Sequence, residues 1–317
     1  MNRQITLPNE VNRVIVLQHQ TLNIINQIGA ANKVVGVLES WKKNLGDGYQ
    51  RLMPGIENLP TPGDLKSVNY EAILALKPDV VFVANYIDKE YINKLTELGV
   101  PVVVVSFFVN SKKGANTVNI EFENPEKSYD EGLYQGIELI GEILGKNKNA
   151  KELIEYVKAS QEELKTITSK IPSNSKIKIY MANPNFTTYG SGKYTGIIFN
   201  RAGGVNVAEK EFKGYKEISK EKFIDLNPEV IFIQDRYPQV ADELKDSSIK
   251  SVAAIKNNRI YMMPEYAKAW GYPTPEAMAL GEFWVAKKLY PEILKDFNLD
   301  KKVDEYYKKF YRTNYKK

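Results

Sequence analysis

The chain of 317 residues lacks cysteine altogether and contains a single histidine, His19. The absence of cysteine excludes disulfides, thiolate catalysis and cysteine-ligated metal clusters. No run of residues approaches the roughly 18 consecutive apolar residues of a membrane-spanning helix. Residues 1–6 lead straight into folded-looking sequence without a signal peptide, as they would in the mature form of a secreted protein.

Motifs typical of enzymes and of nucleic-acid-binding proteins are also missing. The net charge of +5 is mild and the lysines are scattered among acids, so we expect no nucleic-acid partner. A phosphate-binding loop ending in Gly192 and Lys193 would need a glycine at Thr187, and there is no Gly-x-Ser-x-Gly elbow. Because no histidine and acid are paired for proton transfer, we predict that the chain is not an enzyme. A two-lobed α/β enzyme is the rival interpretation.

A sequence repeat is the main positive signal. Residues 70–82 read YEAILALKPDVVF and residues 220–232 read KEKFIDLNPEVIF, so the same pattern returns with Glu221 in the place of Glu71. In each copy a proline ends a short helix, and the apolar run that follows is typical of a parallel strand buried on both faces. The repeat therefore predicts two halves with related α/β folds.

Further periodic segments divide the chain into three parts. Strands are predicted at residues 14–17, 34–38, 80–83, 102–105, 177–181, 230–233 and 260–263. Helical periodicity marks residues 127–146 and 149–171, and two more helices are expected within residues 275–311. We predict two Rossmann-like α/β lobes joined by a long rigid helix, with a ligand cleft between the lobes. The predicted parts are an N-terminal lobe (1–125), a helical connection (126–174) and a C-terminal lobe (175–317).

These motifs, with LGVPV at residues 98–102 and NRAGGVNV at residues 200–207, resemble the helical-backbone (class III) substrate-binding proteins of ABC transporters. That class takes up ferric siderophores, heme, cobalamin and related metal chelates. Two further segments, QHQTLN at 18–23 and WGYPTPE at 270–276, look like a ferric enterobactin-binding branch, some of whose members are implicated in nickel-chelate uptake.

The resemblance implies a monomer that captures a metal chelate and delivers it to an ABC permease dimer in the inner membrane. It implies a periplasmic location, or a lipid-anchored extracellular one in a Gram-positive host. A heme-binding or corrinoid-binding protein of the same class is the alternative.

Glu71 and Glu221 open equivalent predicted helices, one in each lobe. In the family that the chain resembles, the matching glutamates form salt bridges with permease arginines. A carboxylate at an exposed helix start is favoured by the helix dipole, and two at a fixed separation can orient a two-fold symmetric partner. The competing interpretation is that both are ordinary helix-starting residues.

The ligand is predicted from the scarcity of metal-binding side chains. A bare zinc or manganese ion usually needs several histidine and carboxylate ligands, and His19 is the only histidine. We therefore expect no intrinsic cofactor, and a ligand in which iron or nickel is already held by an organic chelator. His19 follows the strand at 14–17, where it could coordinate that metal, hydrogen-bond to the chelate or serve a structural role.

Aromatic, amide and basic side chains gather after the predicted strands, where they could stack on the ligand or hydrogen-bond to it. Arg236 offers a planar fork for carboxylate or catecholate oxygen. Tyr86 and Tyr194 stand where related siderophore binders have arginine, which favours a less charged chelate, such as nickel with amino-acid ligands, or a flat macrocycle. Core packing is the alternative for each tyrosine. The candidate ligand-binding residues are His19, Tyr86, Phe107, Asn183, Tyr189, Lys193, Tyr194, Arg236, Tyr266, Trp270 and Tyr272.

Overall fold

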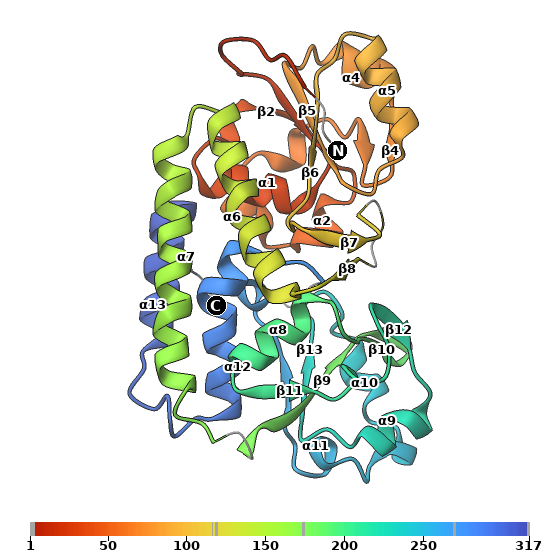
Figure 1. Cartoon of the computed structure of the whole chain (residues 1–317), viewed down its shortest axis with the longest axis vertical. Helices are drawn as coiled ribbons and strands as arrows, with labels where there is room; N and C mark the ends of the chain where they lie inside the picture. Colours follow the sequence, from red (N-terminus) through yellow and green to blue (C-terminus); the bar gives the residue numbers. More distant parts are fainter. Residues whose placement is uncertain (1–3, 116, 118–119, 173–174, 269–270, 316–317) are drawn as a thin grey trace.

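The computed structural model describes residues 4–115, 117, 120–172, 175–268 and 271–315. They form two α/β lobes, one above the other along the long axis (Figure 1). Each lobe contains a four-stranded sheet in which all neighbouring strands are parallel. The first sheet has the order β2 (Val34–Val37), β1 (Val14–Val16), β5 (Val80–Ala84), β6 (Val102–Val105). The second has the order β11 (Gly204–Asn206), β9 (Ile177–Ala182), β13 (Val230–Ile233), β14 (Ile260–Met262).

The two sheets share one strand order, which confirms that the sequence repeat marks related halves. In each sheet the first strand in the chain has the second strand as its neighbour at one edge, and the third and fourth strands lie in order on its other side. The repeated motif forms equivalent pieces in both: α4 (Tyr70–Ala75) precedes β5, and α9 (Lys220–Leu226) precedes β13.

The central strands are buried on both faces, as their unbroken apolar sequences predict. In β13, Val230 and Phe232 face the large core, whereas Ile231 and Ile233 face a smaller cluster on the other side of the sheet. β5 alternates in the same way between the large core and its own outer cluster. Helices therefore cover both faces of each sheet, as parallel sheets require.

The helical connection consists of α6 (Pro125–Ile143) and α7 (Asn147–Thr168), close to the predicted helices. The side chain of Asn124 caps α6 by accepting a hydrogen bond from the Lys127 amide at 3.0 Å. α7 runs along one side of the molecule past both lobes (Figure 1) and packs against α6, α8 (Tyr194–Arg201), α12 (Glu282–Leu289) and the π-helical turn η7 (Ala277–Gly281).

Short elements complete the lobes. The remaining α-helices are α1 (His19–Gln27), α2 (Trp41–Leu45), α3 (Tyr49–Leu52), α5 (Lys89–Glu97), α10 (Val240–Glu243), α11 (Ala253–Lys256) and α13 (Leu299–Tyr306). The 3₁₀ turns include η6 (Glu265–Ala267), and the π-helical turn η8 (Tyr307–Tyr311) follows α13. Three two-stranded ribbons pair β3 (Gly63–Asp64) with β4 (Ser67–Val68), β7 (Ser111–Lys113) with β8 (Glu121–Phe122), and β10 (Thr187–Tyr189) with β12 (Tyr215–Glu217). Within the described ranges, no helix combines the length and the apolar character needed to cross a membrane.

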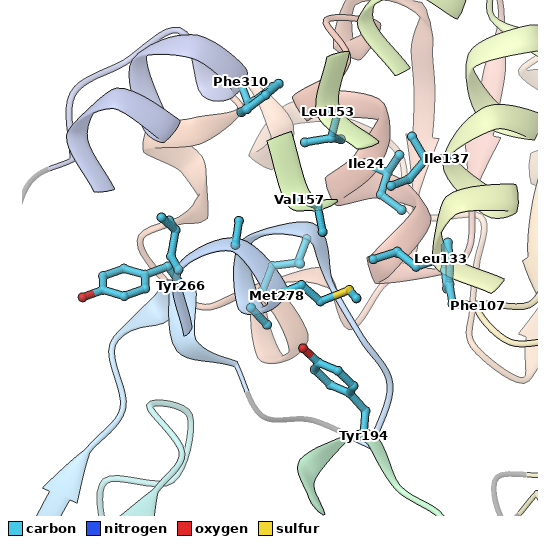
Figure 2. Close-up of a cluster of buried hydrophobic side chains, with 14 of the residues drawn as sticks. Ile24, Phe107, Leu133, Ile137, Leu153, Val157, Tyr194, Tyr266, Met278 and Phe310 are labelled. Carbon is cyan, nitrogen blue, oxygen red and sulfur yellow. The ribbon is translucent and has the colours of Figure 1, made fainter. Parts of the chain in front are cut away.

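One continuous hydrophobic cluster joins the two lobes. It contains strand residues of both sheets and the facing sides of α1, α6 and α7. Figure 2 shows Ile24 of α1, Leu133 of α6 and Val157 of α7 around Met278 of η7. Because these side chains come from all three predicted parts of the chain, the lobes share a core.

The last helices return to the N-terminal lobe. The Tyr306 hydroxyl donates to Gln27 Oε1 at 2.5 Å, and the Tyr311 hydroxyl donates to Asn23 Oδ1 at 2.8 Å, both acceptors being on α1. The boundaries at residues 125 and 174 stay predictions, and the end of the predicted C-terminal lobe contacts the first helix of the N-terminal lobe.

Candidate functional site

The candidate site lies where the carboxyl ends of the strands in one lobe meet those in the other. In the first lobe, β1 leads to His19 and β5 leads to Tyr86. In the second lobe, β9 leads to Asn183 and β13 leads to Arg236. Open α/β sheets present their ligand-binding loops at this edge.

His19 faces the second lobe. It begins α1 and is only 7% exposed. Burial, and then the positive charges of Arg236 and Lys268, lower its pKa from 6.5 to about 3. The imidazole is therefore neutral at physiological pH, with one N–H donor and one acceptor nitrogen.

A chain of hydrogen bonds orients Arg236. Its Nε donates to Gln234 Oε1 at 2.8 Å, and Gln234 Nε2 donates in turn to Asn183 Oδ1 at 2.8 Å. Gln234 Nε2 also lies 3.3 Å from the Tyr189 hydroxyl, which interacts electrostatically with Arg236. The guanidinium carbon lies 4.8 Å from the centre of the Tyr237 ring. These contacts restrict the guanidinium to a narrow range of orientations.

Lys193 and two tyrosines extend the site. Lys193 Nζ lies 5.5 Å from the centre of the Tyr272 ring, and burial lowers the pKa of this lysine to about 8. A Cβ on Gly271 would lie 3.4 Å from Lys193 Cδ and 3.7 Å from Tyr189 Cε1, so the loop passes close to both side chains. Tyr272 interacts electrostatically with Tyr86 of the first lobe. Burial raises the pKa of both phenols, which stay protonated at neutral pH.

Lys268 belongs to the site but was missed by the sequence analysis. Its Nζ donates to the Leu45 carbonyl at the end of α2 at 3.3 Å, and it is 5% exposed. It follows η6, six residues beyond the end of β14, and the sequence analysis selected the aromatic residues around it instead. The one feature of the sequence that could have identified Lys268 is its place in a loop after a predicted strand. We call His19, Tyr86, Tyr189, Lys193, Arg236, Lys268 and Tyr272 the interlobe cluster.

Two predicted residues lie elsewhere, and one lies outside the described residues. Phe107 is in the shared core, where a Cβ on Gly136 of α6 would lie 2.8 Å from its ring. Tyr266 packs against Tyr315, with ring centres 5.4 Å apart. Trp270 falls outside the described ranges. We leave these three out of the candidate site.

Tyr194 also belongs to a different environment, which corrects the expectation that it lines the cleft. Its hydroxyl donates to Oε1 of the fully buried Glu282 at 2.7 Å. Arg201 pairs with the same carboxylate at 3.1 Å, with Glu126 at 2.8 Å and with Asp130 at 2.6 Å. The four charged residues line a cavity of about 400 Å³ beside α7. Burial outweighs the attraction of Arg201 and raises the pKa of Glu282 to about 7.

Glu71 and Glu221 are exposed in the first turns of α4 and α9, at equivalent places in the two lobes. Asn69 caps the first helix by accepting from the Ala72 amide, and Ser219 caps the second by accepting from the Lys222 amide. Hydrogen bonds from its own backbone and from Ser219 lower the pKa of Glu221. The docking role of the two glutamates stays a prediction.

The interlobe cluster offers hydrogen-bond donors rather than metal ligands. Its donors are the guanidinium of Arg236, the two ammonium groups, the phenols and one imidazole N–H. Within the described part of the chain, no three histidine, aspartate or glutamate side chains are grouped to hold a metal ion. The arrangement is thus chemically suited to a small anion whose oxygens accept hydrogen bonds.

Comparison with known proteins identifies the family. The model of a family described as periplasmic binding protein matches residues 14–267. This chain belongs to the periplasmic binding protein family. It is a substrate-binding component of an ABC importer with a ligand and a permease as partners, and not an enzyme. Proteins of the family are periplasmic or anchored as lipoproteins.

A similar curated relative is the molybdate-binding protein MolA of Haemophilus influenzae, 47% identical over 317 residues, which cover all of this chain and 90% of MolA. The structure of MolA bound to molybdate superposes with a TM-score of 0.96, covering 99% of this chain and 97% of that one. A periplasmic solute binding protein from Veillonella parvula has a TM-score of 0.80 at 25% identity, covering 98% and 91% of the two chains. The expected link to an enterobactin-binding, nickel-chelate branch gains no support from the molybdate-binding relative.

Proposed function

We propose that this protein captures a tetrahedral oxyanion of the molybdate type and delivers it to its ABC permease. The supporting observation is that Arg236 and Lys268 lie near a neutral His19 between the lobes, with Lys193 beside Tyr272 of the same cluster. The 47% identity to a molybdate-binding protein over the whole chain points to the same ligand class.

The chemistry of the interlobe cluster suits such an ion. Oxyanion oxygens only accept hydrogen bonds, and the cluster supplies donors from both lobes. Hydrogen bonds from charged donors are shorter and about twice as strong as neutral ones. His19, Lys193 and Lys268 are all under 8% exposed, so water competes weakly for the bound ion. A neutral imidazole adds an N–H donor without adding charge.

The size of the ligand separates this proposal from the metal chelate expected from the sequence. His19 of the first lobe lies near enough to Arg236 and Lys268 of the second for their charges to shift its pKa. Lys268 also donates directly to Leu45 across the lobes. This close approach favours a ligand of a few atoms. A flat macrocycle or a siderophore complex would require the two lobes to separate.

Delivery is proposed to use Glu71 and Glu221. The two carboxylates are exposed on equivalent short helices, at opposite lobes and away from the interlobe cluster. This placement supports recognition of two cationic sites on a permease dimer, with electrostatic attraction setting the orientation of docking.

Calorimetry tests the ligand class. Wild-type protein is titrated with molybdate, tungstate, sulfate, nickel–histidine and ferric citrate, and we expect molybdate and tungstate to bind. Arg236→Gln should weaken oxyanion binding by roughly tenfold to a hundredfold, because a charged hydrogen bond contributes about 1.5–3 kcal/mol. Lys245→Gln, at a side chain 76% exposed, is the matched control and should change nothing. Binding of a chelate with no binding of either oxyanion would contradict the proposal.

A further inference from the structure

Lys268 connects the two lobes through its charged group, which donates a hydrogen bond to the backbone of the first lobe. Its ammonium reaches from the loop after η6 to the carbonyl that ends α2, at 3.3 Å. The same charge acts on His19 in the first lobe and on Asp235 in the second. The ammonium therefore lies between groups of both lobes that border the candidate site.

The net charge of the site indicates which anions Lys268 would favour. Lys193, Arg236 and Lys268 are three cations, and Asp235 is the carboxylate beside them, which leaves a net charge of about +2. Glu265 also acts on Asp235, but its own charge is offset by Arg51 at 2.7 Å. A site with this balance matches a doubly charged anion better than a singly charged one.

We propose that Lys268 is a specificity-determining residue that selects a doubly charged tetrahedral oxyanion over a singly charged one of the same shape. This proposal rests on the proposed function. Arg236 is held by its hydrogen bond to Gln234 and provides geometry as well as charge. Lys268, a flexible point charge, contributes mainly through Coulomb attraction, which doubles when the charge of the ligand doubles.

A purely structural role for Lys268 predicts a different result. If its function were only to connect the loop after η6 to α2 through the hydrogen bond to Leu45, its loss would lower the affinity for every ligand by the same factor, whatever the charge of that ligand. If its charge acts on the ligand, the logarithm of the loss for a dianion should be about twice the logarithm of the loss for a monoanion. Comparing two anions of one shape therefore separates the two roles.

Tungstate and perrhenate supply that comparison, because both are tetrahedral oxyanions of similar size with charges of −2 and −1. Calorimetry at constant ionic strength should show that Lys268→Gln binds perrhenate about threefold and tungstate about tenfold more weakly than wild type. Lys268→Arg keeps the charge and should restore most of the preference for tungstate. Lys245→Gln is the control for a lysine outside the site, and circular dichroism verifies that each variant is folded.

The outcomes distinguish this inference from the proposed function. If wild type binds neither oxyanion, the proposed function fails and the role of Lys268 fails with it. If wild type binds tungstate, but Lys268→Gln weakens the binding of both anions by the same factor or leaves both affinities unchanged, only the role of Lys268 is overturned. Should the glutamine variant not fold, Lys268→Met takes its place: a larger loss of affinity for tungstate than for perrhenate supports the charge role, and equal losses overturn it.

Discussion

Replacing Glu282 with glutamine should change how the stability of the protein depends on pH. The carboxyl is fully buried, and its pKa rises from the ordinary 4.5 to about 7. Between these values the folded state holds a proton that the unfolded state has lost, so stability falls as pH rises. At about 1.4 kcal/mol per pH unit, ionised Glu282 costs the folded protein about 3 kcal/mol above pH 7. Glutamine keeps an oxygen for Tyr194 and Arg201 but never ionises.

His19 acts with the opposite sign and conceals this effect in wild type. Its pKa falls from 6.5 to about 3, so between these values the unfolded state holds the proton and stability rises with pH. From about pH 4.5 to 6.5 the two slopes cancel. Glu282→Gln removes one of them, and the variant should therefore gain stability with rising pH over a range in which wild type changes little.

Urea unfolding at half-unit steps from pH 4.5 to 8 measures the difference directly. The free energy of unfolding of Glu282→Gln, relative to wild type, should increase by about 3 kcal/mol across the series. Glu162→Gln is the matched control, because it lines the same cavity but its side chain is 75% exposed; we expect under about 0.5 kcal/mol. Parallel pH curves for Glu282→Gln and wild type would refute the reasoning.

Three further predictions concern packing, docking and motion. Gly132→Ala should lower the free energy of unfolding in urea by about 1–3 kcal/mol, because the new Cβ would lie 2.1 Å from the backbone of Phe108. The control is Gly196→Ala, whose new Cβ would have its nearest neighbour 3.9 Å away and should leave stability unchanged or raise it; equal losses of stability in the two variants would contradict this. Glu71→Ala combined with Glu221→Ala should slow transport in reconstituted vesicles while leaving oxyanion affinity at the wild-type value, and a loss of affinity would place these residues in the ligand site. Paired crystal structures with and without molybdate should differ by only a few degrees of lobe rotation, because α7 and the shared core connect the lobes; a rotation of tens of degrees would contradict that view.

The fold could be predicted from the sequence because its signals are local. Pro78 and Pro228 end helices, and the apolar runs after them form the strands buried on both faces. α7 was predicted by its apolar stripe and differs from the prediction only at its ends. These features depend on residues a few positions apart, and the repeat supplied the relation between the halves.

The site could be predicted only in part, because its contacts join distant residues. His19, Lys193 and Arg236 were predicted as site residues because they follow predicted strands, and Lys193 directly precedes a helix. Tyr194 shares such a position, but its hydroxyl bonds to Glu282, which lies 88 residues later. A sequence pattern does not say which way a tyrosine at a helix start will point. Lys268 was overlooked for a similar reason, because its hydrogen-bond partner in the first lobe, Leu45, lies 223 residues earlier.

The return of the C-terminal tyrosines to α1 has a consequence for how the protein acquires its fold. Asn23 and Gln27 receive their hydrogen bonds from Tyr311 and Tyr306, which are 288 and 279 residues away. During synthesis, the helix that begins with His19 is made almost first, yet its buried amides obtain these partners almost last. Such long loops are slow to close, so the first lobe has to wait for the rest of the chain. A nascent or proteolytic fragment that ends before Tyr306 would contain His19 and its helix without the hydrogen bonds that Tyr306 and Tyr311 donate to that helix.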